Sequence, residues 1–298
     1  MTDETRDGTA VFQQHRPRMF GIAYRMLGSA DEAEDTVQDA WLRWSGADRT
    51  DVGQPAAWLA KTVTRLCLNR LDSARVRRER YVGPWLPEPV LTAGGALGPL
   101  ESAEQRDGVS LALLVLLERL TPAERAVYVL REAFGYGHRE IAALLDLTEA
   151  NCRQLHRRAA QRTAAPRPRY EADPARLRGL VDTFLAAARD GDVAALEELL
   201  AADVTYWSDG GEKVGAARRP VSGRDRVARL VAGLWSKYAA GLDFGFAEVN
   251  GAPAVLVRAG GAVAGVLVVD MAGGRILGLR AVVNPDKLGF VQRQLSRS

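Results

Sequence analysis

The sequence is poor in the residues that build disulfide scaffolds and metal sites. It has two cysteines, three histidines and four methionines among 298 residues. Cys67 and Cys152 stand far apart in the chain, so they favour a reducing compartment over a disulfide framework. Cys152 and His156 share a helix face, but two ligands without others nearby are too few for a metal. We therefore expect neither a metal nor a cofactor.

Long apolar runs are also missing. The most apolar stretch, residues 109–117, is shorter than the ~20 residues that a membrane-spanning helix needs. The N-terminus, MTDETRDGTA, is polar and acidic and is unlike a signal peptide. No glycine-rich motif typical of phosphate binding occurs. These features predict a cytoplasmic protein with no membrane partner.

Charge of one sign is not in excess, since 40 Lys and Arg face 37 Asp and Glu. Two stretches divide the chain: residues 83–99 are rich in proline and glycine, and residues 164–174 contain three prolines. The apolar residues of the first two parts of the chain, before and after the first linker, recur with helical periodicity, whereas the part after the second linker has helical stretches followed by alternating, strand-like segments. We predict two all-α domains followed by an α+β domain with a curved sheet. The expected divisions are a helical bundle at 8–82, a linker at 83–108, a helix-turn-helix domain at 109–165, a linker at 166–173 and a third domain at 174–298.

A helix-turn-helix pattern covers residues 138–161. A helix at 138–145 and a tight turn at 146–148 precede a basic helix at 149–161, and no Asp or Glu occurs from 151 to 169. The N-terminal turns of such a second helix enter the DNA major groove, where Arg and Gln read base edges. A solvated basic face on a structural helix is the alternative. The candidate DNA-binding residues here are Arg153, Gln154, His156, Arg157 and Arg158.

A second basic stretch lies near residues 61–80, with Trp58 and Tyr81 beside it. Aromatic rings next to arginines suit unstacked single-stranded bases. A solvated face is again the alternative, and for Trp58 we favour a place in the core. The candidates are Lys61, Arg65, Asn69, Arg70, Arg75, Arg77 and Arg78.

The helix expected after Ser29 is acidic, and no Lys or Arg occurs from 27 to 41. Such a face repels DNA and predicts a basic protein partner. Helix-dipole capping explains the acids of the first turn almost as well. It does not explain the later residues Gln38, Asp39 and Trp41.

These elements together resemble a known family. FGIAYRMLGSADEAEDTVQDAWLRW resembles region 2 of sigma-70 factors, and LTPAERAVYVLREAFGYGHREIAALLDLTEANCRQLHRRA resembles region 4. Without a region 3 between them, the chain is similar to extracytoplasmic-function (ECF) sigma factors. The resemblance implies a factor that directs RNA polymerase core enzyme to promoter DNA and starts transcription.

The resemblance also implies residue roles. Residues 58–75 would capture the −10 element, although Arg65 stands where many relatives have Asn, and the helix at 149–161 would read the −35 element. The polymerase-binding residues would be Asp35, Gln38, Asp39 and Trp41, which would bind the clamp helices of the polymerase, and Phe134, which would contact the flap tip.

The third domain resembles a SnoaL-like cone, in which a curved sheet wraps helices around a pocket. We predict helices at 174–189, 192–201 and 223–240, and strands at 243–249, 253–259, 262–270 and 275–283. Three short motifs, at residues 85–89, 209–213 and 284–288, resemble the signature of ECF factors with such a fused domain. In the second motif, Glu212 stands where a third glycine is usual. In that subgroup the domain acts as a built-in regulator.

A stiff, proline-rich segment anchored by Trp85 could dock on the third domain. Asp209, Lys213, Asp286 and Lys287 would hydrogen-bond across that contact. Each motif alone could be only a turn or a terminator. The predicted regulatory residues are Trp85, Leu86, Pro87, Glu88, Pro89, Asp209, Gly210, Gly211, Lys213, Asn284, Pro285, Asp286, Lys287 and Leu288.

Two other functions stay open for the third domain, a small-molecule sensor and a cyclase-like or isomerase-like enzyme. None of the three histidines lies in this domain, so we expect no catalysis, although a carboxylate alone could act as a base. The residues that could line a pocket are Tyr206, Trp207, Asp209, Trp235 and Asp243. A ligand would regulate only if it bound two arrangements of the chain with different affinity.

Overall fold

The computed structural model describes residues 3–48, 52–79, 81–92, 108–164 and 174–297. Within these ranges, the side chains of residues 3–7, 72–79 and 174–175 are not described. The chain divides into two compact units. The described residues of the first unit are 3–48, 52–79 and 112–164, and those of the second are 81–92, 108–111 and 174–297. The segment after α3 therefore belongs with the third domain of the sequence.

The first unit begins with three helices, α1 (Asp3–Leu27), α2 (Ala30–Ser45) and α3 (Pro55–Glu79). Gly28 ends α1 with a φ of +68°, which glycine adopts without strain. Ser29 then caps α2, because its hydroxyl accepts a hydrogen bond from the backbone N–H of Glu32 at 3.1 Å. Apolar faces of the three helices bury Phe20, Tyr24 and Leu59.

The rest of this unit holds the predicted helix-turn-helix. Its helices are α5 (Leu111–Leu117), α6 (Pro122–Tyr128), α7 (His138–Leu145) and α8 (Glu149–Thr163), and α6 continues as a π-helical turn, η3 (Val129–Ala133). Thr121 and Glu124 form a capping box at the start of α6. Asp146 ends α7 with a φ of 55°, and Thr148 caps α8.

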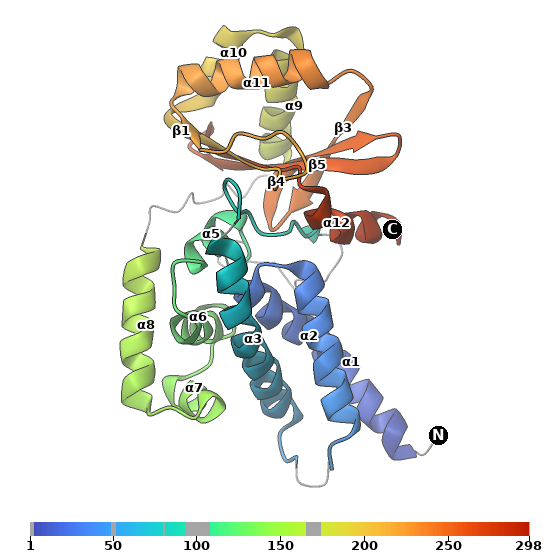
Figure 1. Cartoon of the computed structure of the whole chain (residues 1–298), viewed down its shortest axis with the longest axis vertical. Coiled ribbons are helices and arrows are strands. Elements are labelled where there is room, and N and C mark those ends of the chain that lie inside the picture. Colours follow the sequence, from blue (N-terminus) through green and yellow to red (C-terminus); the bar gives the residue numbers. More distant parts are fainter. Residues whose placement is uncertain (1–2, 49–51, 80, 93–107, 165–173, 298) are drawn as a thin grey trace. The chain divides into compact units, whose positions relative to one another are not determined.

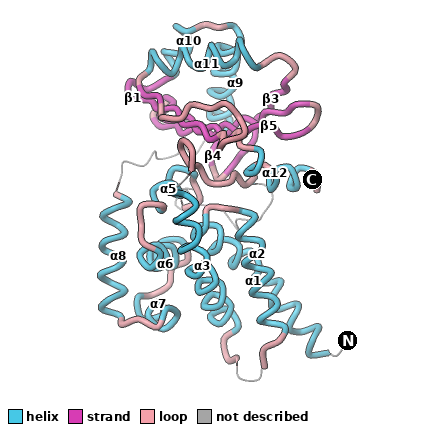
Figure 2. The backbone as a smooth tube through the Cα atoms, viewed as in Figure 1, coloured by secondary structure: helices cyan, strands magenta, loops and turns pink. Residues whose placement is uncertain are grey.

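The second unit combines helices with a six-stranded sheet. Its elements are α9 (Pro174–Asp190), α10 (Val193–Leu199), β1 (Leu200–Asp209), β2 (Val221–Ser222), α11 (Arg224–Tyr238), β3 (Leu242–Val249), β4 (Ala252–Ala259), β5 (Ala262–Ala272), β6 (Arg275–Val282), η4 (Pro285–Lys287) and α12 (Gly289–Leu295). The strand order is β2-β1-β6-β5-β4-β3, with only the β1–β6 pair parallel among the described strands. Helices α9, α10 and α11 cover one face of the sheet (Figures 1 and 2).

Side chains alternate between the two faces of β1, so neighbouring residues at its end face different surroundings. Val204, Tyr206 and Ser208 are buried, and Val204 and Tyr206 join the core formed with the helices. Asp209 is also buried, but it follows Ser208 and so points to the other face of the strand. The predicted fold class, two helical sigma domains followed by an α+β domain with a curved sheet, is confirmed. Strand β1 was not among the predicted strands, and its first residues lie in the range predicted as a helix at 192–201. Strand β2 and helix α12 were not predicted either, because two and seven residues are too short for a periodic signal.

Candidate nucleic-acid and linker-docking sites

Helix α8 presents a cationic surface. Arg153, Gln154, Arg157 and Arg158 are exposed, which leaves their side chains accessible to DNA. His156 is half-buried, and its Nε2 lies 2.8 Å from a carboxylate oxygen of Glu132. The exposed residues and His156 are thus on the helix that the sequence assigned to the −35 element.

One arginine of α8 has a structural role instead. The Arg162 guanidinium lies 2.6 Å from the carboxylate of Glu124, which is 3% exposed. The same carboxylate accepts a hydrogen bond from the backbone N–H of Thr121 at 3.0 Å. Arg162 therefore fastens α8 to the start of α6, and its charge is not free for phosphate.

The three cations of α3 whose side chains are described are paired with carboxylates. Lys61 Nζ lies 3.0 Å from the carboxylate of Asp146, and Arg65 forms an ion pair with the same carboxylate. Arg70 pairs with Asp39 of α2 at 2.7 Å, whereas Asn69 is exposed. The side chains of Arg75, Arg77 and Arg78 lie outside the described part. A nucleic acid that binds Lys61 and Arg65 would therefore compete with the Asp146 carboxylate, in the turn after α7, for these two cations.

Helix α2 has an exposed face on which acidic and apolar groups meet. Asp35 and Gln38 are exposed, and the Leu42 residue is 62% exposed. Positions 35, 38 and 42 are three and four residues apart and share one face. Trp41 is half-buried, and its ring lies 4.9 Å from that of Phe12. The sequence analysis missed Leu42, which is a large apolar side chain beside predicted polymerase-binding residues.

Phe134 follows the π-helical turn and is covered by two arginines. The Arg18 and Arg25 guanidinium groups lie 5.4 Å and 5.2 Å from the Phe134 ring centroid. Burial lowers the pKa of Arg25 to about 10, so Arg25 remains a cation at neutral pH. A polymerase segment that contacts Phe134 would either displace the Arg18 and Arg25 guanidinium groups from the ring or contact them as well.

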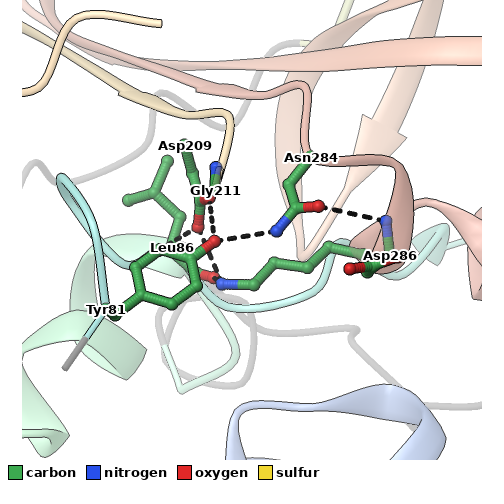
Figure 3. A network of polar contacts seen from close by, with 7 residues as sticks. Tyr81, Leu86, Asp209, Gly211, Asn284 and Asp286 are labelled. Carbon is green, nitrogen blue, oxygen red and sulfur yellow. Dashed lines mark hydrogen bonds and ion pairs between the residues drawn. The ribbon is translucent and has the colours of Figure 1, made fainter. Parts of the chain in front are cut away.

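Within the second unit, the segment after α3 packs against residues 174–297 through hydrogen bonds to a buried ion pair (Figure 3). The Asp209 carboxylate accepts a hydrogen bond from the backbone N–H of Leu86 at 2.8 Å and lies 2.7 Å from Lys287 Nζ. The side chains of Asp209 and Lys287 are 0% and 9% exposed. The Tyr81 hydroxyl donates to Asp209 and accepts a hydrogen bond from Asn284 Nδ2 at 2.8 Å. Burial, and then the bond to Asp209, raise the pKa of Tyr81 above its usual range, so its hydroxyl keeps the proton that it donates.

Lys287 joins both sides of this contact. Its Nζ donates to the Leu86 carbonyl at 2.6 Å and lies over the rings of Trp85 and Tyr81, at 4.3 Å and 4.7 Å from their centroids. Leu86 is 1% exposed, which removes its apolar side chain from water. The other motif residues surround this contact: Pro87, Pro89 and Leu288 are buried, Glu88 is half-buried, and Pro285 is exposed.

Lys213 and Asp286 form an exposed ion pair with each other at 2.6 Å. Among the described residues, neither side chain hydrogen-bonds to the linker, so their predicted contacts across it stay predictions. The glycines before Lys213 have steric roles instead. A Cβ on Gly210 would lie 2.4 Å from the Val214 carbonyl oxygen. Gly211 has a φ of +56°, and a Cβ there would lie 2.7 Å from Asn284 Nδ2, so only glycine lets this loop approach.

Asn250, which was not predicted, contacts Val90 within the linker and Val109 directly after it. Its Oδ1 accepts a hydrogen bond from the Val90 N–H at 3.0 Å, and its backbone N–H donates to the Val90 carbonyl at 2.9 Å. Its Nδ2 donates to the Val109 carbonyl at 2.8 Å. Asn250 and Val90 are both 0% exposed. The neighbouring residues add a hydrogen bond from the Gly251 N–H to Thr92 Oγ1 at 2.9 Å.

The residues proposed for an enzymatic pocket separate into two groups. Tyr206 and Trp235 line a cavity inside the second unit. Asp209 binds the linker, Trp207 lies 4.4 Å from the Arg280 guanidinium, and Asp243 is exposed on β3. Neither carboxylate of the set is among the residues that line the cavity.

Two further features concern metals and membranes. Over the described ranges, no group of three or more His, Cys, Asp and Glu residues is placed to hold a metal ion. In the same part of the chain, no helix has both the length and the apolar character needed to cross a bilayer.

The helical unit defines a class of transcription factor, and the comparisons with known proteins agree. Residues 11–77 match the family model for sigma-70 region 2, and residues 110–162 match that for sigma-70 region 4. The ECF RNA polymerase sigma factor SigJ of Mycobacterium tuberculosis is 37% identical, over 93% of this chain and 91% of that protein. A probable ECF sigma factor, SigI, from the same species is 34% identical, over 96% and 97%. The chain therefore belongs to the ECF sigma factors.

A solved structure extends the similarity to the second unit. The crystal structure of Mycobacterium tuberculosis SigJ matches with a TM-score of 0.75 and 31% identity, over 95% of this chain and 98% of that one. The chain is thus an ECF sigma factor with a fused C-terminal SnoaL-like domain. Sigma factors bind RNA polymerase core enzyme and promoter DNA, and they are regulators of transcription rather than enzymes.

Proposed function

We propose that the C-terminal domain of this sigma factor controls promoter recognition by holding the linker between regions 2 and 4. The observation that carries the proposal is a pair of hydrogen bonds of the Asn250 side chain, which accepts from the Val90 N–H and donates to the Val109 carbonyl. Val90 and Val109 stand on either side of residues 91–108, the greater part of the predicted linker between the two DNA-binding regions. One buried side chain therefore holds both ends of that stretch.

This Asn250 clamp, made by its hydrogen bonds with Val90 and Val109, restricts how far the linker can extend. A chain of the 18 residues between positions 90 and 109 could extend to roughly 60 Å if its ends were free. Promoter elements at −35 and −10 are about 25 base pairs apart, which is on the order of 85 Å of duplex. Holding both ends at Asn250 removes the contribution of this segment to that span. We infer that the docked linker corresponds to the less active state of the factor.

The residue roles follow from the same proposal. In the active state, α8 would read the −35 element through Arg153, Gln154, His156, Arg157 and Arg158. Helix α3 would contact the −10 element through Lys61, Arg65, Asn69 and Arg70, with Arg75, Arg77 and Arg78 further along. Polymerase would bind α2 at Asp35, Gln38, Asp39 and Trp41, with Leu42 added, and would contact Phe134. The exposure of most of the α8 and α2 residues supports these assignments.

We further propose that the C-terminal domain has no enzymatic activity. No Asp, Glu, His, Lys or Arg is among the residues that line its cavity, so the cavity offers no strong acid or base. The observed chemistry supports a sensor for a small molecule in preference to a cyclase or isomerase.

Run-off transcription with core polymerase tests the regulatory proposal without any ligand. Asp209→Asn removes the buried negative charge that binds Lys287 and Leu86, and we expect it to raise the transcript yield several-fold. Asp286→Asn removes an exposed carboxylate from the same surface and is the matched control. A yield for Asp209→Asn that equals or falls below the control would contradict the proposal.

A further inference from the structure

The second unit contains a cavity of about 620 Å³ between the sheet and helices α9 and α11. This volume lies within the roughly 300–1,000 Å³ range of small-molecule pockets. Its walls include Phe184 of α9, Leu234 and Trp235 of α11, and Phe244 and Val255 of the sheet. The rings of Trp235 and Phe244 are stacked, with centroids 4.2 Å apart.

The chemistry of the walls is apolar and uncharged. Polar atoms come from few side chains, chiefly Tyr206, Ser208 and Tyr238. Burial raises the pKa of Tyr206 to about 12, so its phenol stays neutral and can donate a hydrogen bond. Tyr238 and Val214 are 51% and 41% exposed although both line the cavity, which leaves apolar surface open to water.

We propose that this cavity binds an uncharged lipophilic molecule that carries one or two hydroxyl or carbonyl groups. A carboxylate or phosphate has no cationic partner among the lining residues, so its burial would be strongly unfavourable. An aliphatic or flat polycyclic body would cover the Trp235 and Phe244 rings and the branched side chains. The regulatory effect of such a ligand rests on the linker control proposed above.

One loop connects the cavity with the docked linker. Residues 214–217 line the cavity, while Gly211 at the start of the same loop packs against Asn284 and the Tyr81 hydroxyl. The Ala217 N–H donates to Ser208 Oγ at 2.9 Å, which fixes the loop to the cavity face of β1. The following residue, Asp209, binds Leu86 and Lys287.

The loop has open space on both sides. A second hollow of about 430 Å³ is lined by Val82, Gly83 and residues 210–218. Residues 214–217 therefore separate the cavity from a hollow that reaches the linker. Because the cavity is open while the linker is docked, a ligand that fills it contacts the loop in this arrangement. Such a ligand stabilises the docked linker by its higher affinity for that state, and it lowers transcription.

Titration of the full-length protein with Nile red, a neutral lipophilic dye, tests the site. We expect saturable binding of one dye per chain, displaced by dodecanol but not by dodecanoate. Leu234→Trp fills the cavity and should weaken dye binding at least tenfold. Ser236→Trp places the same ring on the exposed side of α11 and should leave binding unchanged. Ala264→Leu, at a half-buried lining position on β5, is a milder second block.

Hydrogen exchange at the Leu86 and Val90 amides reports the coupling. Saturating dodecanol should slow exchange at both amides in the wild-type protein and not in Leu234→Trp. The site is refuted if the wild-type protein does not bind the dye saturably, if dodecanoate competes as well as dodecanol, or if both blocking variants bind like wild type. Unchanged exchange on saturation refutes the coupling. None of these results bears on Asp209→Asn transcription, which is measured without ligand.

Discussion

Asp209 and Leu86 are separated by 123 residues, yet the carboxylate of one accepts a hydrogen bond from the backbone N–H of the other at 2.8 Å. The same carboxylate is fully buried and pairs with Lys287. A buried charge is tolerated only when it is paired and hydrogen-bonded. The linker is therefore part of the structure that keeps Asp209 stable, and its docking is tied to the stability of the C-terminal domain.

Asp209→Asn should lower the free energy of unfolding of the second unit by roughly 3–5 kcal/mol, because it leaves Lys287 buried without a counter-charge. Asp286→Asn, in an ion pair whose side chains are about 60% exposed, should cost about 0–1 kcal/mol. Urea unfolding of the full chain, followed by tryptophan fluorescence, measures both. Equal unfolding midpoints for the two variants would show that the buried pair does not stabilise the domain.

Asn250→Ala should also destabilise the docked linker. It leaves the buried Val90 N–H and Val109 carbonyl without partners, at about 1–3 kcal/mol each. It also places alanine at a φ of 54°, a left-handed conformation that asparagine tolerates better. Amide hydrogen exchange should become faster at Val90. Asn250→Gly relieves the backbone strain but loses the same side-chain bonds, so unchanged exchange in both variants would exclude the clamp.

The contacts of Asn250 with Val90 and Val109 could not be predicted from the sequence. Asn250 and Gly251 form the two-residue turn between β3 and β4, and both have positive φ, which is sufficient reason for an Asn-Gly pair. Nothing local indicates that the Asn250 side chain also reaches Val90 and Val109, which are 160 and 141 positions away. Sequence alone predicts the turn, whereas the contact depends on tertiary packing.

Elements with local signals were predicted more fully. The helix at 138–145 has its predicted bounds, and the basic helix predicted at 149–161 begins at Glu149 as expected. Motif resemblance also led to Asp209, Lys287 and the Leu86 segment that they contact, but not to Tyr81, which hydrogen-bonds to Asp209. The Lys213–Asp286 pair was not predicted, because a charged residue beside a motif can pair equally well within its own surface.

Asp146→Asn should strengthen binding of single-stranded DNA by the free factor. The change releases Lys61 and Arg65 from their shared carboxylate, and asparagine keeps the left-handed turn at φ 55°. Each exposed ion pair contributes roughly 0–1 kcal/mol, so we expect a gain of a few-fold. Fluorescence anisotropy with a short labelled oligonucleotide measures the affinity. Asp225→Asn breaks an exposed ion pair with Arg229 in the second unit and should have no effect. A gain in neither variant would place Lys61 and Arg65 outside the DNA-binding surface.

Arg153→Ala should weaken recognition of the −35 element by about 1–3 kcal/mol if its guanidinium contacts a base with two hydrogen bonds. Its present partner, Glu149, lies one turn earlier on α8, in an exposed pair that DNA can replace. Arg229→Ala on α11 removes an arginine from a similar exposed pair and is the control. The measurement is competition between a promoter duplex and a scrambled duplex for the polymerase holoenzyme. An unchanged preference in Arg153→Ala would remove this residue from base recognition.

A reversible covalent lock tests the central claim most directly. Leu91 and Val249 are paired across an antiparallel bridge, so cysteines at both positions can form a disulfide that fixes the linker in its docked place. The native Cys67 and Cys152 are buried, and burial raises the pKa of both thiols, which keeps them unreactive. Run-off transcription with core polymerase should give little transcript from the oxidised Leu91→Cys/Val249→Cys variant and recover on reduction, while wild type responds to neither treatment. Equal transcript yields from the oxidised and reduced variant would contradict control of this sigma factor by its linker.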